Sequence, residues 1–389
     1  MSEHVILIHG DLLTKERLDA IHEARSIEDT PKHCFEFLVF IPGLFHFKMA
    51  CADALWRIWI KPKEGRNDMN SLFQHVGVLR PHESGKFSTN PGFRRMHDVV
   101  HHDLWASILN CWETEASERN SSWDSLEAFA KSKPMPEMIV EMSESIVEKY
   151  IATSKTVSSA NQLPAKERDR RFENQTLQNR DELLYVDLCH AMNSGDIGRV
   201  EASILPWIYM FKLTGKPKYA YQMTRFMIYM CYVYTTDLRQ IIRLNWLCNP
   251  TGQAFKFCPV DWLVERNNLY TKVIFAGKGS NRTIQHIIQE LPLIELYQAC
   301  HVMVENGFHL QNCTIKHAPP NMVKTLEELK QEIQKCSPHK TKAGRTADYA
   351  VCNWIAAGIE LLMQYKEGIK EGEGDEQGDG VFADDLIGD

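Results

Sequence analysis

Segments with the pattern of β-strands occur only in the first sixty residues of the chain, and this limits the sheet that it can form. The two apolar runs are VILIHG (5–10) and CFEFLVFIP (34–42). Between them lies TKERLDAIHEAR (14–25), which has helical composition and Thr14 as its expected N-cap. Strand, helix and strand in this order predict a parallel pair joined by a right-handed crossover.

Helical spacing of apolar residues dominates the rest of the chain from about residue 93 onward. We therefore predict an α+β fold that is predominantly α-helical, in which a short parallel βαβ unit is joined to a large helical domain. Two strands alone form a marginal sheet. They either rest against the helical domain or belong to a larger sheet whose other strands are encoded elsewhere.

Four regions follow from these patterns. The βαβ unit occupies residues 1–60, and a helical domain with a polar linker near 154–175 occupies residues 61–258. C-terminal helices that return to the βαβ unit occupy 259–365, and an acidic tail that we expect to be disordered occupies 366–389.

The formal net charge of −7 comes entirely from this tail, which holds nine acidic and two basic residues. The remaining 365 residues carry 42 basic and 42 acidic side chains (44 − 2 and 51 − 9). A neutral body argues against strong non-specific DNA binding, which needs a basic surface. Two local basic patches, 165–171 and 339–345, are the places where weak phosphate contacts are possible.

The cysteines indicate a reducing compartment. The chain has eleven of them, none in a C-x-x-C pair, and no signal-peptide pattern. We therefore expect reduced thiols in an intracellular protein, nuclear or cytoplasmic. No apolar run reaches the roughly 18 to 20 residues of a membrane span, so we expect no membrane association.

Polar residues at the two strand ends are candidates for a site. Asp11 follows the first strand and His46 follows the second, and ligands gather outside the carboxyl ends of strands in α/β sheets. Asp11 is equally well placed to cap the helix behind it. Asp261 and Glu265 lie four residues apart on a later predicted helix, so both carboxylates share one helix face.

A second candidate is the stretch RRMHDVVHHDLW, which places His97 and His101 on one helical face, as a metal site needs. The H-E-x-x-H glutamate and a third ligand at a recognisable offset are both missing, so a polar helix face is favoured over zinc. The nucleophile elbow, the Walker loop and a G-x-G-x-x-G after a strand are absent. None of the eleven cysteines can be identified as catalytic, because no base is assigned to activate its thiol.

Four motifs in order resemble an uncharacterised family of fungi and some animals, associated with mobile elements and known as domain of unknown function 6589. The resemblance covers roughly residues 5–360. The matching positions of the first two motifs are Gly10, Asp11, Leu13, Thr14 and Arg17, followed by Gly43, His46, Lys48 and Met49. Those of the last two are Cys258, Pro259, Asp261, Glu265 and Asn268, followed by Gly279, Asn281 and Thr283.

This family in turn resembles transposases with a ribonuclease-H-like core, in which three acids hold two Mg²⁺ or Mn²⁺ ions for DNA strand cleavage and transfer. The resemblance implies that residues 1–60 are part of such a core. Asp11 is then the second acid and Glu265 the third, with Asp261 as a neighbouring ligand and His46 shaping the site. Residues 61–258 are then the helical insertion that these enzymes carry.

The resemblance also implies that the first acid and the first three strands would lie before residue 1. We therefore expect a transposase-derived protein that is inactive alone, unless a partner chain supplies the missing strands. The alternative is a helical scaffold or protein-interaction module in which Asp11 merely caps a helix. A third possibility is a metal-binding protein that uses His97 and His101.

Overall fold

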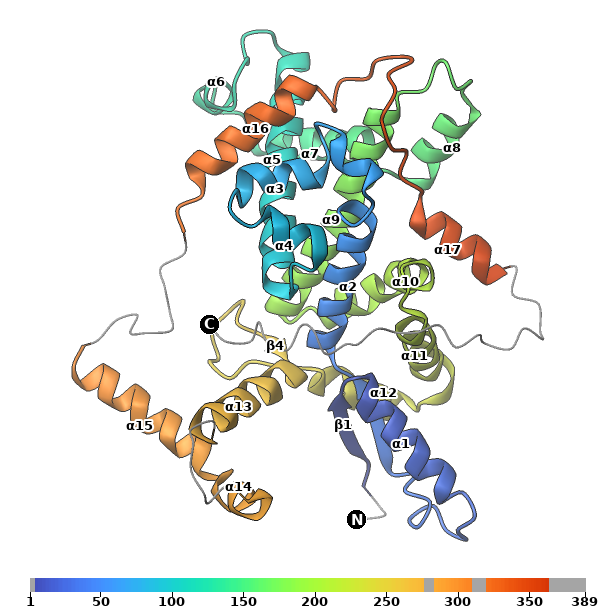
Figure 1. Ribbon diagram of the computed structural model, residues 1–389, viewed down its shortest axis with the longest axis vertical. Coiled ribbons are helices and arrows are strands. Elements are labelled where there is room, and N and C mark those ends of the chain that lie inside the picture. Colours follow the sequence, from blue (N-terminus) through green and yellow to red (C-terminus); the bar gives the residue numbers. More distant parts are fainter. Residues whose placement is uncertain (1–3, 276–282, 310–319, 364–389) are drawn as a thin grey trace.

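Helices make up most of the computed structural model, which describes residues 4–275, 283–309 and 320–363 (Figure 1). The predicted fold class, predominantly α-helical with a short parallel βαβ unit, is confirmed. In the described chain the sheets are two pairs of strands: β1 (Ile6–Gly10) with β2 (Leu38–Pro42), and β3 (Leu247–Cys248) with β4 (Cys258–Pro259).

The strands β1 and β2 pair in parallel, from Ile6 opposite Leu38 to Gly10 opposite Pro42. The helix between them, α1 (Leu12–Ala24), begins two residues earlier than the sequence pattern predicted. Asp11, not Thr14, is its N-cap, because the Asp11 carboxylate accepts from the Thr14 amide at 2.8 Å. Thr14 lies three residues further on, at the position whose amide an N-cap side chain binds.

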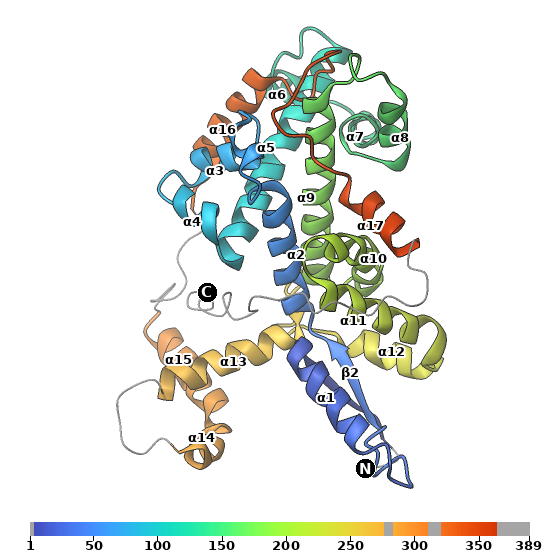
Figure 2. The same ribbon diagram turned by 45° about the vertical axis from the view of Figure 1, so that its right-hand side comes forward.

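The helix α2 (Leu44–Trp59) leads directly from β2 into the helical body and is buried along most of its length. It packs against two long helices, α5 (Phe93–Arg119) and α9 (Arg170–Ser194), which also pack against each other (Figure 2). Apolar burial on all sides of α2 explains why its sequence is apolar beyond one stripe. The strand pair is thus anchored to the body through a continuous, buried helix.

The remaining helices surround this centre. On one side of it lie α3 (Leu72–Leu79), α4 (Ser84–Thr89) and α16 (Val323–Cys336), and on the other α10 (Ile197–Leu213), α11 (Pro217–Ile228) and α17 (Trp354–Met363) (Figures 1 and 2). Along the chain, α5 is followed by α6 (Leu126–Lys131), α7 (Pro136–Tyr150) and α8 (Ser154–Gln162), of which α6 and α7 pack against α5. The helix α8 occupies part of the segment predicted as a linker, and its residues are mostly exposed. One turn of 3₁₀-helix (Glu64–Asn67) and one of π-helix (Tyr229–Val233) complete the body.

The chain returns to the strand pair near residue 260. After α12 (Thr236–Asn245) and the β3–β4 hairpin, α13 (Val260–Phe275) packs against both α2 and β1. The helices α14 (Ile284–Glu290) and α15 (Leu293–Gly307) follow it, apart from the helical body (Figure 1). In the described chain no further strand joins β1 and β2, so these two rest against α1, α11 and α13. Residues 366–389, the predicted acidic tail, lie outside the described residues.

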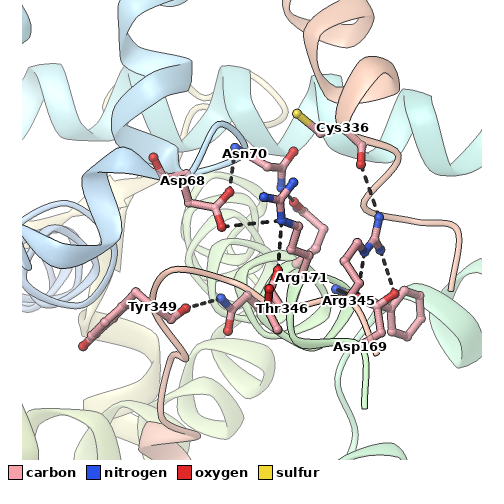
Figure 3. A network of polar contacts seen from close by, with 12 residues as sticks. Asp68, Asn70, Asp169, Arg171, Cys336, Arg345, Thr346 and Tyr349 are labelled. Carbon is pink, nitrogen blue, oxygen red and sulfur yellow. Dashed lines mark hydrogen bonds and ion pairs between the residues drawn. The ribbon is translucent and has the colours of Figure 1, made fainter. Parts of the chain in front are cut away.

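A segment after α16 crosses the beginning of α9 and holds it by ion pairs and backbone hydrogen bonds (Figure 3). Arg345 donates two hydrogen bonds to the Asp169 carboxylate, both at 2.8 Å, and another to the carbonyl of Cys336 at 3.3 Å. Arg171 donates to the carbonyl of Thr346 at 3.2 Å. A bidentate arginine–carboxylate pair is the strong form of such a contact.

No helix in the described residues has the length and apolarity of a membrane span.

Candidate functional site

The predicted polar residues gather where β1 and β2 end, at Gly10 and Pro42, which we call the carboxyl edge. The Asp261 side chain is only 4% exposed there. Its carboxylate accepts hydrogen bonds from the amides of Phe45, at 3.0 and 3.1 Å, and of His46, at 3.1 Å. These amides belong to the first turn of α2, where backbone N–H groups have no partner within the helix. Asp261 therefore caps α2 from more than two hundred residues away.

Gly43, the residue at the N-cap of α2, makes this contact possible. A β-carbon at this position would lie 2.4 Å from Oδ2 of Asp261. The backbone of Gly43 is extended, with φ of −67° and ψ of 117°, which any residue can adopt. The glycine is needed because the carboxylate comes so close, and the helix dipole further stabilises the negative charge there.

His46 lies between two carboxylates. Its Nδ1 is 2.9 Å from Oδ2 of Asp261, and its Nε2 is 4.0 Å from Oε1 of Glu265. Burial by itself lowers the pKa of His46, but the hydrogen bond to Asp261 and the charges of Asp261, Glu265 and Asp11 outweigh it. The pKa is therefore raised above 6.5. The imidazole is held in one orientation by a buried carboxylate and faces a more accessible one.

Asp11 completes the group at the end of β1. One of its oxygens, Oδ1, accepts from the amide and the hydroxyl of Thr14, both at 2.8 Å. Its charge contributes to the raised pKa of His46, which places the two side chains in one electrostatic neighbourhood. The other oxygen, Oδ2, has no donor among the described residues. All four predicted residues, Asp11, His46, Asp261 and Glu265, are thus brought to the carboxyl edge.

The donor chemistry at this edge fits a hard divalent cation, since carboxylate oxygens are what Mg²⁺ and Mn²⁺ prefer. Asp11 and Glu265 retain acceptor capacity, whereas the oxygens of Asp261 are engaged by three N–H donors, two from the backbone and one from the His46 ring. The ligand atoms are not gathered for an ion: in the described chain, the group of three ligands that lie mutually within 4.8 Å is elsewhere. Rotation of Asp11 and Glu265 would be needed to assemble them.

That other group combines the two predicted histidines with a cysteine that sequence spacing could not reveal. His97 and His101 on α5 have ring centroids 4.3 Å apart, and Cys189 reaches them from α9. Burial, followed by the charges of His101 and Lys48, lowers the pKa of His97 to about 2. Burial also lowers the pKa of His101 and raises that of the Cys189 thiol.

Two contacts that support the carboxyl edge also had no signal in the sequence. The indole Nε1 of Trp246 donates to the carbonyl of Pro42 at 2.8 Å, and the hydroxyl of Tyr219 donates to the carbonyl of His46 at 3.5 Å. Pro42 is the last residue of β2, and His46 lies in the first turn of α2. These aromatic residues fix the backbone on which His46 stands.

The two basic patches, 165–171 and 339–345, lie side by side, because the segment after α16 crosses the start of α9. Much of their charge is already paired, since Arg168 and Arg170 both bind the Glu173 carboxylate, at 2.7 and 3.1 Å. Paired guanidinium groups offer less to phosphates than free ones. Any DNA contact here remains a prediction.

No curated protein and no solved structure matches this chain. Of the motifs compared above, Gly279 and Asn281 lie outside the described residues. Residues 1–317, more than half of the chain, match the Family of unknown function (DUF6589). This chain is therefore a member of the DUF6589 family.

Proposed function

We propose that the chain derives from a transposase of a mobile element, and that its carboxyl edge is what remains of a metal-dependent site for DNA strand cleavage and transfer. One observation carries this proposal: α13 returns after the helical domain and places Glu265 beside His46, at the ends of a parallel strand pair. A helix that brings an acid back to strand ends after a long insertion is the arrangement that the transposase resemblance implies.

In this proposal, Asp11 and Glu265 supply the carboxylate oxygens for a divalent cation. His46 is kept in place by the buried Asp261, so that its Nε2 is directed toward Glu265. In the ancestral enzyme, bound Mg²⁺ or Mn²⁺ would activate a water molecule and stabilise the leaving 3′ oxygen of DNA. The protein's own contribution is the positioning of these three side chains around one point.

The same geometry argues against cleavage by the chain alone. A two-metal site shares three acids between its ions. Of the three acids at the carboxyl edge in the described chain, Asp261 has its oxygens occupied by N–H groups of α2 and of the His46 ring. Two acids with free capacity remain, Asp11 and Glu265. We therefore propose that the protein binds one divalent cation and does not cleave DNA.

Calorimetric titration of the full chain with MnCl₂ tests the cation site. We expect one binding event, weakened at least tenfold in Glu265→Gln and in Asp11→Asn, since an asparagine keeps the helix cap but loses the charge. Glu332→Gln on the distant α16, an exposed acid paired with Lys335, is the matched control and should bind as the wild type does. No heat from the wild type, or equal heat from all variants, would refute the site.

A labelled DNA duplex incubated with the protein and Mn²⁺ tests the absence of cleavage. We expect intact DNA at every protein concentration. Cleavage that disappears in Glu265→Gln would show that the chain is an active nuclease, and this part of the proposal would then be wrong while the cation site would stand.

A helical protein-interaction module is the second candidate, and one feature favours it. The helices α14 and α15 and the residue that follows α15 expose large apolar side chains, among them Ile284, Ile288, Met303 and Phe308, at 60 to 78% of their surface. Grouped apolar residues on a surface are typical of interaction sites. Under this alternative Asp11 and Glu265 only support the fold, so their variants lower the unfolding midpoint while Mn²⁺ binding is absent from the start.

A further inference from the structure

The group formed by His97, His101 and Cys189 lies inside the helical body, between α5 and α9, and has the composition of a transition-metal site. The ligand atoms of His97, His101 and Cys189 all lie within 4.8 Å of one another. In a tetrahedral zinc site, with Zn–N near 2.0–2.1 Å and Zn–S near 2.3 Å, neighbouring ligand atoms are about 3.4 to 3.6 Å apart. The ligand atoms must therefore approach one another by at most about 1.4 Å, which small side-chain rotations can supply.

In both imidazoles the ring nitrogen Nδ1 already has a hydrogen-bond partner, which orients the ring. Nδ1 of His101 donates to the backbone carbonyl of His97 at 2.9 Å, which leaves Nε2 of His101 with its lone pair. Nδ1 of His97 lies 2.8 Å from the hydroxyl of Tyr185. A backbone carbonyl or a polar side chain behind the ring is the usual outer partner of a metal-binding histidine, because it fixes the tautomer and the ring plane.

Tyr185 also connects the histidines to the cysteine. It precedes Cys189 by one turn of α9, and its hydroxyl lies 2.8 Å from Nδ1 of His97. If Nδ1 of His97 donates to Tyr185, Nε2 of His97 keeps its lone pair and is free to bind an ion. One consistent set of hydrogens thus leaves all three ligand atoms with an available lone pair.

We propose that His97, His101 and Cys189 bind a zinc ion, with the fourth position open to water or a small ligand. Two imidazoles and a thiolate select zinc or copper over the hard cations Mg²⁺ and Mn²⁺. Three protein ligands with one open position are typical of catalytic rather than structural zinc sites. On binding, the Cys189 thiol loses its proton to solvent and a Zn–S bond replaces the S–H bond, so one proton is released per ion.

Lys48 is the charge that opposes this ion. Its ammonium group is near enough to act on all three ligands, and it lies over the rings of Phe45 and Phe93, 5.9 and 5.5 Å from their centroids. Contact with the aromatic faces offsets part of the cost of burying this charge. Replacing Lys48 by methionine keeps the apolar stem and should therefore tighten zinc binding.

The site is tested with the full chain, purified under reducing conditions, by elemental analysis and by titration with Zn²⁺ against a coloured chelator. We expect one zinc per chain in the wild type. Affinity should fall at least a hundredfold in His101→Ala and in Cys189→Ser, and it should rise several-fold in Lys48→Met. The control His102→Ala, on the same helix but outside the group, should bind zinc as the wild type does, and so should Glu265→Gln.

Cobalt substitution decides the case without any variant. Co²⁺ in the wild type should give the intense d–d absorption of a tetrahedral ion and a thiolate-to-cobalt charge-transfer band. Absence of the charge-transfer band, or zinc affinity unchanged in Cys189→Ser, would overturn the proposal. Because this site is independent of the carboxyl edge, failure of Mn²⁺ binding there would leave it untouched.

Discussion

Replacement of Gly43 by alanine is the sharpest test of how α13 is held to the carboxyl edge. The backbone at this position suits alanine, so the whole effect must come from the added β-carbon. That atom would lie 2.4 Å from Oδ2 and 2.7 Å from Cγ of Asp261, so the carboxylate must move. Its movement breaks hydrogen bonds to the amides of Phe45 and His46 and to the His46 ring.

The size of the effect follows from these three donors. A hydrogen bond to a charged group contributes about 1.5 to 3 kcal/mol, and water replaces part of what is lost. We therefore expect Gly43→Ala to lower the free energy of unfolding by about 3 to 5 kcal/mol, a large share of the ~5–15 kcal/mol of an ordinary domain. Asp261→Ala removes the same three contacts and should cost a similar amount.

The double variant separates this explanation from a general loss of packing. Without the Asp261 carboxylate, the next nearest atom to the new β-carbon is the carbonyl oxygen of Gly10, at 3.0 Å. In that background Gly43→Ala should cost less than about 1 kcal/mol, so the coupling energy should exceed about 2 kcal/mol. Gly77→Ala within α3 is the control: its β-carbon meets nothing within 4 Å, and it should stabilise by up to about 1 kcal/mol.

Urea unfolding followed by circular dichroism and tryptophan fluorescence gives the four free energies of the cycle, provided that the slope with urea is the same in all variants. Additive effects, within about 0.5 kcal/mol, would mean that the alanine at position 43 and Asp261 do not meet. The proposed close approach of α13 to α2 would then be refuted.

Two further predictions concern other parts of the body. Burial lowers the pKa of His339 from 6.5 to about 3, and its Nε2 faces the Asn179 amide group at 3.3 Å while Nδ1 donates to Asn110 at 2.7 Å. His339 therefore becomes protonated near pH 6.5 in the unfolded chain but stays neutral in the folded chain. Its contribution to the free energy of unfolding falls by about 1.4 kcal/mol per pH unit from pH 6.5 toward 3. His339→Gln should flatten this slope between pH 6 and 4.5 in urea titrations, and an unchanged slope would contradict the burial of a neutral ring. Gly358→Ala would place a β-carbon 2.3 Å from the carbonyl oxygen of Tyr209, so α17 should detach from α10 and its amides lose protection in hydrogen exchange; unchanged protection would contradict their close packing.

Local patterns predicted the local elements well. The apolar runs 5–10 and 34–42 identified both strands and their ends, because each run stops at a turn signal, but β2 begins only at Leu38, four residues later than predicted. The start of α1 was misplaced: Asp11 and Thr14 are both good N-caps, and sequence preference alone does not decide between them. The helix α8 was missed, since seven of its nine residues are polar and its two apolar residues, Val157 and Ala160, are too few to form an apolar stripe.

The candidate site was predictable as a set of residues but not as a set of roles. Spacing placed Asp261 and Glu265 on one helix face, yet it could not show that the first is buried against α2 while the second faces His46. The place of Cys189 beside the two histidines could not be predicted from the sequence for a related reason. Its approach to His97 depends on the packing of α5 against α9, which no spacing along the chain encodes.

The contact between Asp261 and Phe45 has a consequence for the order of folding. It closes a loop of 216 residues, and for a flexible chain the closure alone costs about 5 kcal/mol of entropy. A single carboxylate cannot offset this, so the helices between the two residues must assemble first and bring them near each other. The carboxyl edge therefore forms late, and a molecule with an incomplete helical body does not carry it. A ligand of the carboxyl edge would therefore bind completely folded chains and not partly folded ones.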